Sequence, residues 1–380
     1  IEKNIEQGCC AYLSSDSAKK HEGFAVNVFN TLGVKNAFLS GFLRGWIESK
    51  SIEESMSWGN ACGAIVASRK NSYLEMPYEE ELQEFFRNQQ TVSKLQPVHR
   101  QIMVANKLKK SKPCCLITFD HRDFFDQYLR NSEASFKDVE EFKALLAQSV
   151  ISLQERYSEL CIGAVVDQKY GTKASLCLRN SNIWQARCIE QVNVKGISFI
   201  DKQESYALVK QWPSYCTVKA LVKRTSSATH IQEVAALKNL YKACCEYGNP
   251  LIIEIVSQAD QEQEDLLNAM KLYYEKGIYP SYWKLPLIRE MSFWNNCQNI
   301  IEEYDPYNQG ILVLGEGKTA NQLSNAFSSI LDNSMVNGVA LGRCFWEDLA
   351  DKFLCKQINY SQINEEIHKR FAVISSSLIK

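Results

Sequence analysis

Long apolar runs are missing from this chain of 380 residues. No run approaches the roughly 18 consecutive apolar residues of a membrane-spanning helix. The opening residues 1–10 also lack the apolar stretch of a secretory signal. We therefore expect no membrane partner and a cytoplasmic protein. Residue 1 is Ile rather than Met, which leaves open whether it is the true start of the protein.

A net charge of either sign is missing as well. The chain has 43 Lys and Arg against 44 Asp and Glu, a formal net charge of −1. Such a balance supplies no general attraction for a polyanion, so the sequence predicts no nucleic-acid partner. Small neutral molecules and localised phosphate sites stay possible.

Metal-ligand motifs are scarce. There are five His, none paired with another His or a Cys at ligand spacing, and the 14 Cys form no C-x-x-C pair. Many of these Cys lie in apolar, strand-like runs, where a reduced thiol behaves as a small hydrophobic side chain. We expect no metal site and no cofactor.

The composition that is present is globular. Hydrophobic residues make up 45% and charged residues 23%, enough for a sizeable core. Gly and Ala are frequent from Leu32 to Ser68, and a polar stretch follows from Arg87 to Pro113. We expect an amino-terminal segment over 1–90, a linker over 91–112 and a larger domain over 113–380.

Short apolar segments alternate with amphipathic, helix-like segments in the larger domain. This alternation predicts parallel strands joined by helices, and eight such units indicate a (β/α)8 TIM barrel. A doubly wound open sheet would want a Gly-rich turn after the first strand, where this chain has Asp, His, Arg and Asp at 120–123. The expected strands are Cys115–Asp120, Ile162–Asp167, Gln185–Glu190, Thr217–Val222, Leu251–Val256, Ser281–Pro286, Gly310–Gly315 and Gly338–Arg343.

Polar side chains lie at or near the carboxyl ends of these strands, which is where such barrels place their active sites. Two of them are lysines, Lys219 and Lys284. A lysine among other cations and apolar walls loses its proton readily and attacks a ketone, so the pair indicates imine chemistry. Lys284, flanked by aromatic residues, is the preferred nucleophile, with Lys219 as the alternative. A lysine that points out into solvent is the competing interpretation of Lys284.

Two carboxylates accompany the lysines. Glu254 lies in an apolar strand, where an ionised carboxylate is costly unless it is paired or functional. We consider two roles for it, a general acid/base and a structural ion pair with Lys219. Asp120 is either a carboxylate that handles a substrate hydroxyl or a helix cap.

A phosphate site is expected where the last two strands end. Gly315 ends the seventh strand, and Gly342 with Arg343 ends the eighth. Barrels commonly bind phosphate through backbone N–H groups at this position, and a guanidinium would add to them.

The strand-end segments, in this order from about residue 95, resemble the aldolase domain of bifunctional 5-dehydro-2-deoxygluconokinase/5-dehydro-2-deoxyphosphogluconate aldolases of myo-inositol catabolism. The segments are 116–122, 251–256, 279–285, 311–315 and 339–343. The resemblance implies a class I aldolase that cleaves a sugar phosphate, 5-dehydro-2-deoxygluconate 6-phosphate, to dihydroxyacetone phosphate and malonate semialdehyde.

Residues 30–46 and 58–69 are similar to the carboxyl-terminal part of ribokinase-like (PfkB) sugar kinases. Gly33 is followed by Val34 and Lys35 where the family has the Ala-Gly of its anion hole, and by Asn36 where it has the catalytic Asp. An amide cannot accept the proton of an attacking hydroxyl, so the resemblance implies an inactive kinase remnant.

Two rival functions stay open. One is a kinase subunit completed by a separate amino-terminal chain, and the other is a non-catalytic sugar-phosphate-binding or scaffold protein. The sequence also leaves a homo-oligomer possible.

Overall fold

The computed structural model describes residues 2–4, 8–14, 17–69, 76–87, 112–191, 196–200, 204–224, 230–257, 262–315 and 319–379. The chain forms two compact units, Ile1–Met103 and Val104–Lys380. They divide inside the expected linker, whose residues 91–111 lie outside the described residues. No helix in the described part of the chain is long and apolar enough to cross a bilayer.

The described part of the first unit combines a small antiparallel sheet with three helices. Its strand order is β1-β2-β3. Helix α2 begins with a capping box, in which Ser51 and Glu54 each accept a backbone N–H of the other residue. The elements are β1 (Glu2–Asn4), β2 (Gly8–Ser14), β3 (Ser17–His21), α1 (Val34–Ile47), α2 (Ile52–Ala67) and α3 (Glu79–Arg87).

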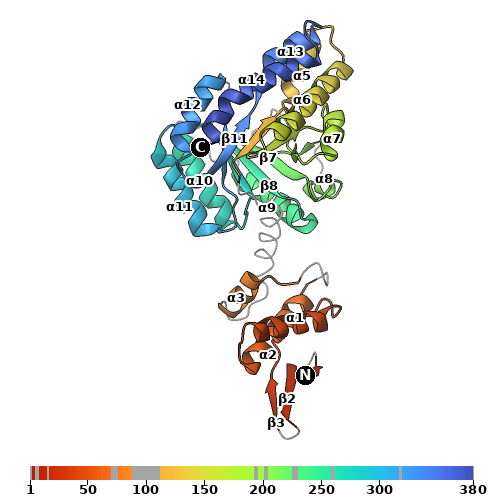
Figure 1. The fold of residues 1–380 in the computed structure, drawn as a ribbon, viewed down its shortest axis with the longest axis vertical. Helices are drawn as coiled ribbons and strands as arrows, with labels where there is room; N and C mark the ends of the chain where they lie inside the picture. The colour runs from red at the N-terminus through yellow and green to blue at the C-terminus, as the bar shows by residue number, and fades with distance from the viewer. Residues whose placement is uncertain are drawn as a thin grey trace. The chain divides into compact units, whose positions relative to one another are not determined.

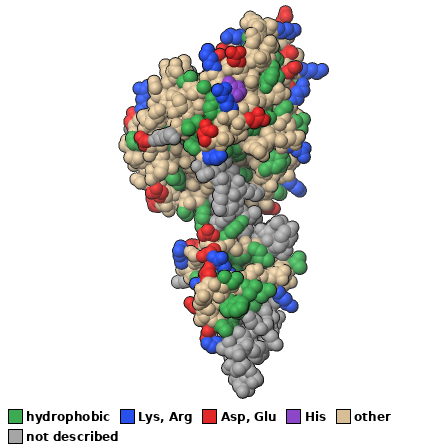
Figure 2. Space-filling view, in the orientation of Figure 1, with side chains coloured by type: hydrophobic (Ala, Val, Ile, Leu, Met, Phe, Trp, Pro, Cys, Tyr) green, Lys and Arg blue, Asp and Glu red, His purple; other side chains and the backbone are tan. Residues whose placement is uncertain are grey.

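Helix α1 buries one face and exposes another. Val34 and Phe38 are buried, whereas Leu39 is 52% exposed and Trp46 63% exposed. The exposed positions, with Leu43 between them, follow each other at four and three residues and so share one face of the helix. Figure 2 shows hydrophobic side chains at the visible surface of this unit.

The second unit is a closed barrel of eight parallel strands (Figure 1). The strands follow one another around the barrel in chain order from β4 to β11, and β11 pairs with β4 to close it. The predicted TIM barrel is confirmed. The strands are β4 (Cys114–Thr118), β5 (Cys161–Val166), β6 (Trp184–Cys188), β7 (Thr217–Arg224), β8 (Leu251–Ser257), β9 (Tyr282–Leu285), β10 (Ile311–Leu314) and β11 (Val336–Leu341).

Helices surround the strands and bury one face each. In α6, Val139, Phe142, Leu146 and Val150 recur at three and four residues, and all are buried. The elements are α5 (Arg122–Arg130), α6 (Phe136–Arg156), α7 (Thr172–Arg179), α8 (Ser205–Val209), α9 (His230–Tyr247), α10 (Glu262–Glu275), α11 (Met291–Tyr304), α12 (Ala320–Ile330), η5 (Arg343–Phe345), α13 (Glu347–Leu354) and α14 (Tyr360–Leu378).

Side chains alternate between the inside of the barrel and the helix layer. Leu116, Ile252 and Tyr282 pack together in a small cluster, whereas Ile253 and Trp283, the next residues along β8 and β9, belong to the large core. Because strand side chains repeat every two residues, the following positions of the inward set are Glu254 and Lys284. The alternation thus directs the candidate site residues into the barrel mouth.

Gly338 lies where β11 meets β4 so closely that a Cβ would clash with the carbonyl oxygen of Cys114. We predict that Gly338→Ala lowers the free energy of unfolding of the barrel by about 1 to 3 kcal/mol, because the backbone must shift. Gly315→Ala is the control, since its Cβ would meet its nearest neighbours at an ordinary 3.4 Å. Urea unfolding of both variants and the wild type measures the difference. A Gly338→Ala variant as stable as Gly315→Ala would refute the close contact of β11 with β4.

Candidate active site

A cavity of about 550 Å³ lies at the carboxyl ends of the barrel strands, and all seven barrel residues expected from the sequence line it. They come from six strands or the turns after them, so the closed barrel brings together positions that are far apart in the chain. The residues are Asp120, Lys219, Glu254, Lys284, Gly315, Gly342 and Arg343.

Lys284 and Glu254 face each other from neighbouring strands. Their positions are paired in the register of β8 and β9, and Lys284 Nζ lies 3.0 Å from Glu254 Oε2. Both side chains are buried, so Lys284 does not point out into solvent. This contact is the one ion pair of Lys284 among the described residues.

Lys219 is surrounded by carboxylates. Its Nζ lies 2.8 Å from Glu254 Oε2 and 3.1 Å from both Asp120 Oδ2 and Glu190 Oε1. Burial alone would lower the pKa of this ammonium, but Asp120, Glu190 and Glu254 outweigh it and raise the pKa well above its usual value. Lys219 is therefore a fixed cation at neutral pH.

The carboxylates are held ionised in return. Burial acts to raise the pKa values of Asp120 and Glu254, but Lys219 and Lys284 more than offset it, and both pKa values lie below their usual range. Asp120 does not cap α5 with its side chain, because α5 follows His121 and has no side-chain cap. The structural ion pair considered for Glu254 with Lys219 is present, and the same oxygen also contacts Lys284.

Glu190 belongs to this cluster and was missed from the sequence. It is buried two residues beyond β6, and its Oε2 accepts the backbone N–H of Leu221 at 3.2 Å. The signal was available, because Trp184 and Ala186 point into the barrel and Glu190 continues the same alternation. Following this alternation to the end of the expected strand would have predicted that Glu190 points into the barrel, next to Lys219.

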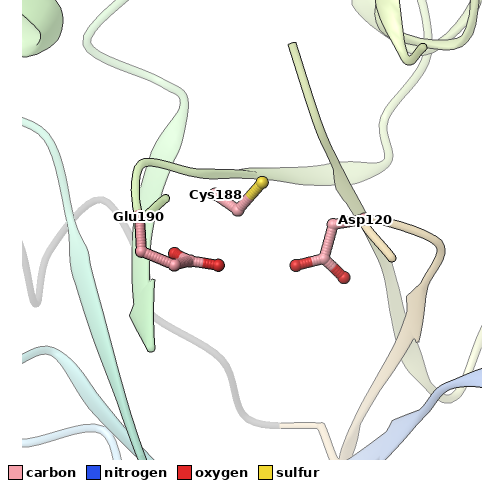
Figure 3. Close-up of side chains that lie close together, drawn as sticks. All are labelled: Asp120, Cys188 and Glu190. Carbon is pink, nitrogen blue, oxygen red and sulfur yellow. The ribbon is translucent and has the colours of Figure 1, made fainter. Parts of the chain in front are cut away.

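Asp120, Cys188 and Glu190 form a group of three potential metal ligands (Figure 3). One carboxylate oxygen of each acid and the Cys188 Sγ all lie within 4.8 Å of one another. However, Lys219 Nζ already lies 3.1 Å from both carboxylates. Burial, with Glu190 adding to it, raises the pKa of the Cys188 thiol well above its usual value, so the sulfur is not a thiolate. The three side chains therefore suit the ammonium that they surround better than a divalent ion.

The expected phosphate end of the cavity offers a guanidinium and one glycine N–H. Arg343 is exposed at the cavity, and the N–H of Gly342 has no acceptor among the described residues. The N–H of Gly315 donates to Ala340 O at 3.0 Å. It is thus already used in the barrel, which removes the backbone contact to phosphate that we expected of it.

The expected kinase residues lie in the first unit. Gly33 precedes α1 with a φ of 84°, a left-handed conformation that suits glycine. Val34 is buried, whereas Lys35 and Asn36 are exposed on the first turn of α1. The backbone carbonyl of Asn36 accepts the hydroxyl of Ser40 at 2.9 Å.

The fold and the cavity define a TIM-barrel protein with buried lysines and carboxylates at the carboxyl ends of its strands. Residues 81–378, more than half of the chain, match a family described as "Uncharacterized protein conserved in bacteria (DUF2090)". The chain belongs to this family. Residues 6–78 match the pfkB family of carbohydrate kinases, which confirms the kinase-like amino-terminal segment.

Curated relatives match a minor part of the chain. The 5-dehydro-2-deoxygluconokinase of Bacillus subtilis is 29% identical over 87 residues, which are 23% of this chain and 27% of the relative. The ATP-dependent ribose-1-phosphate kinase of Halopiger xanaduensis is 36% identical over 52 residues, 14% of this chain and 18% of the relative. The chain thus spans about a quarter or less of these kinases.

Among solved structures, the fructose-bisphosphate aldolase of Slackia heliotrinireducens is similar at 12% identity and a TM-score of 0.48. The similarity covers 76% of this chain and 93% of the aldolase. A likeness of this degree does not extend to activity.

Lys219→Met should destabilise the barrel by about 3 to 5 kcal/mol at pH 7, because it leaves buried carboxylates without their cation. The loss should shrink as the pH falls from 7 to 5. In this range the carboxylates of the wild type stay ionised, because their pKa values in the folded protein are low. In the variant the unpaired carboxylates take up protons as the pH falls, which removes the cost of burying their charge and stabilises the folded variant.

Chemical unfolding at both pH values measures the two losses. Lys173→Met is the control, since Lys173 is 50% exposed and 3.9 Å from Glu140, and it should change stability by less than about 0.5 kcal/mol at either pH. A Lys219→Met loss that does not change with pH would contradict the assignment of Lys219 as the counter-ion of the cluster.

Proposed function

We propose that the barrel is a Schiff-base (class I) aldolase acting on 5-dehydro-2-deoxygluconate 6-phosphate. The observation that carries the proposal is the unequal setting of the two buried lysines. Lys219 contacts three carboxylates and stays charged, whereas Lys284 contacts one. A fixed cation next to an amine that must lose its proton is the arrangement that imine formation needs.

Lys284 Nζ attacks the C5 ketone of the substrate, and loss of water gives a protonated imine. The C3–C4 bond then breaks, and its electron pair moves into the C4–C5 bond as the imine becomes an enamine. Glu254, ionised and 3.0 Å from Nζ, takes the proton of the C3 hydroxyl as malonate semialdehyde leaves. Protonation of C4 and addition of water release dihydroxyacetone phosphate and restore Lys284.

The remaining residues hold charge in place. Lys219 stabilises the ionised Glu254 and Asp120 through direct contacts. Asp120 is close enough to this cluster to serve as an alternative or helper base. Arg343 and the N–H of Gly342 would bind the phosphate at the ends of β10 and β11. The site requires no metal, because Lys284 provides the electron sink.

We further propose that the kinase-like segment does not transfer phosphate. Lys35 lies on the turn that follows Gly33, where the family binds phosphate through small residues, and Asn36 has no basic oxygen to receive the hydroxyl proton.

Lys284→Arg should abolish both turnover and borohydride trapping, because a guanidinium stays protonated and cannot attack a carbonyl. Glu254→Gln should slow cleavage by about 10² to 10⁴ while some adduct still forms. Mass spectrometry of the trapped protein after digestion locates the modified lysine. An adduct on a peptide containing Lys219 would show that the other lysine is the nucleophile.

Purified protein should not phosphorylate 5-dehydro-2-deoxygluconate with ATP, because the position of the base is occupied by Asn36. Production of ADP, followed with and without the sugar acid, measures this directly. Sugar-dependent turnover that disappears when residues 33–36 are replaced would overturn the assignment of an inactive segment.

A further inference from the structure

Arg122 is a buried cation that the proposed reaction does not use. It is the first residue of α5, its side chain is 8% exposed, and it lines the same cavity as Lys284. Its Nη2 makes one long contact, 3.5 Å to Glu190 Oε1, and its buried Nε has no hydrogen-bond partner among the described residues. A guanidinium offers five N–H donors, so most of its capacity is available to a ligand.

Glu190 is already committed elsewhere. Its Oε1 accepts Lys219 Nζ at 3.1 Å, and its Oε2 accepts the backbone N–H of Leu221. The one carboxylate that pairs with Arg122 among the described residues is thus shared with a closer ammonium. His121 next to it lines the same cavity, and its buried Nδ1 has no hydrogen-bond partner in the described part of the chain, with Asp120 Oδ1 3.9 Å away.

The position of Arg122 in the barrel indicates which end of the substrate it faces. It lies in the segment after β4 and contacts Glu190, two residues beyond β6, and β5 lies between these strands. In a closed ring of eight strands, β5 is opposite β9, which carries Lys284, whereas β10 and β11 with Arg343 follow β9 directly. A substrate with its ketone on Lys284 and its phosphate toward β10 and β11 extends its other end toward Arg122.

We propose that Arg122 binds the carboxylate of the substrate and so makes the site specific for keto-acid phosphates over neutral ketose phosphates. This inference rests on the proposed aldolase function and adds the residue that recognises the carboxylate end of its substrate. Planar guanidinium and carboxylate groups form paired, charge-assisted hydrogen bonds, which a neutral terminus cannot replace.

The reverse reaction, aldol condensation, tests the two ends of the substrate separately, because the phosphate and the carboxylate are then on different reactants. One sample of wild-type protein is treated with dihydroxyacetone phosphate and borohydride to trap the imine. A separate, unreduced sample is supplied with dihydroxyacetone phosphate and either malonate semialdehyde or propanal, an acceptor of the same carbon count without a carboxylate. Wild type should prefer malonate semialdehyde in kcat/KM, and Arg122→Met should reduce this preference by about 10- to 100-fold. Trapping of dihydroxyacetone phosphate should be unchanged in the variant, which also shows that it folds.

Lys223→Met is the matched control, since Lys223 lines the same cavity at β7, and it should keep the preference. If Arg122→Met does not fold, inhibition of the wild type by 3-hydroxypropionate but not by 1,3-propanediol supports the carboxylate site, and equal inhibition overturns it. No adduct with the wild type contradicts the aldolase function itself. An adduct with equal use of both aldehydes, weaker trapping of dihydroxyacetone phosphate by Arg122→Met, or loss of the preference in Lys223→Met contradicts the role of Arg122.

Discussion

One carboxylate oxygen between two buried ammonium groups organises the site. Glu254 Oε2 lies 2.8 Å from Lys219 Nζ and 3.0 Å from Lys284 Nζ, and the three residues stand on consecutive strands β7, β8 and β9. Each charge would be costly alone in the barrel interior, so the cluster persists because its members are paired. The strand order and the two-residue alternation that point these side chains inward are therefore preconditions of the chemistry.

The sequence was sufficient for the barrel and for most of the site. All eight expected strands are present, because parallel strands buried on both sides are short apolar runs that stand out between amphipathic helices. The rule that active residues finish such strands then located Lys219, Glu254 and Lys284. Glu190 was missed because the rule was applied without the alternation that separates inward from outward positions.

Other features depend on contacts that no local pattern encodes. The different settings of the two lysines come from the carboxylates around Lys219, which belong to β8 and to the turns after β4 and β6. The N–H of Gly315 looked available for phosphate, but β11 supplies its acceptor, Ala340 O. The antiparallel sheet β1-β2-β3 was likewise not among the expected strands. Pairings of this kind require the folded structure.

The central claim is that Lys219 is a permanent cation and Lys284 the amine that bonds to substrate. A crystal structure of the protein reduced with borohydride in the presence of dihydroxyacetone phosphate tests it most directly. The account predicts continuous density from Lys284 Nζ to the former carbonyl carbon, with Lys219 Nζ still in contact with Asp120, Glu190 and Glu254. Density that joins the ligand to Lys219, with Lys284 unmodified, would contradict it.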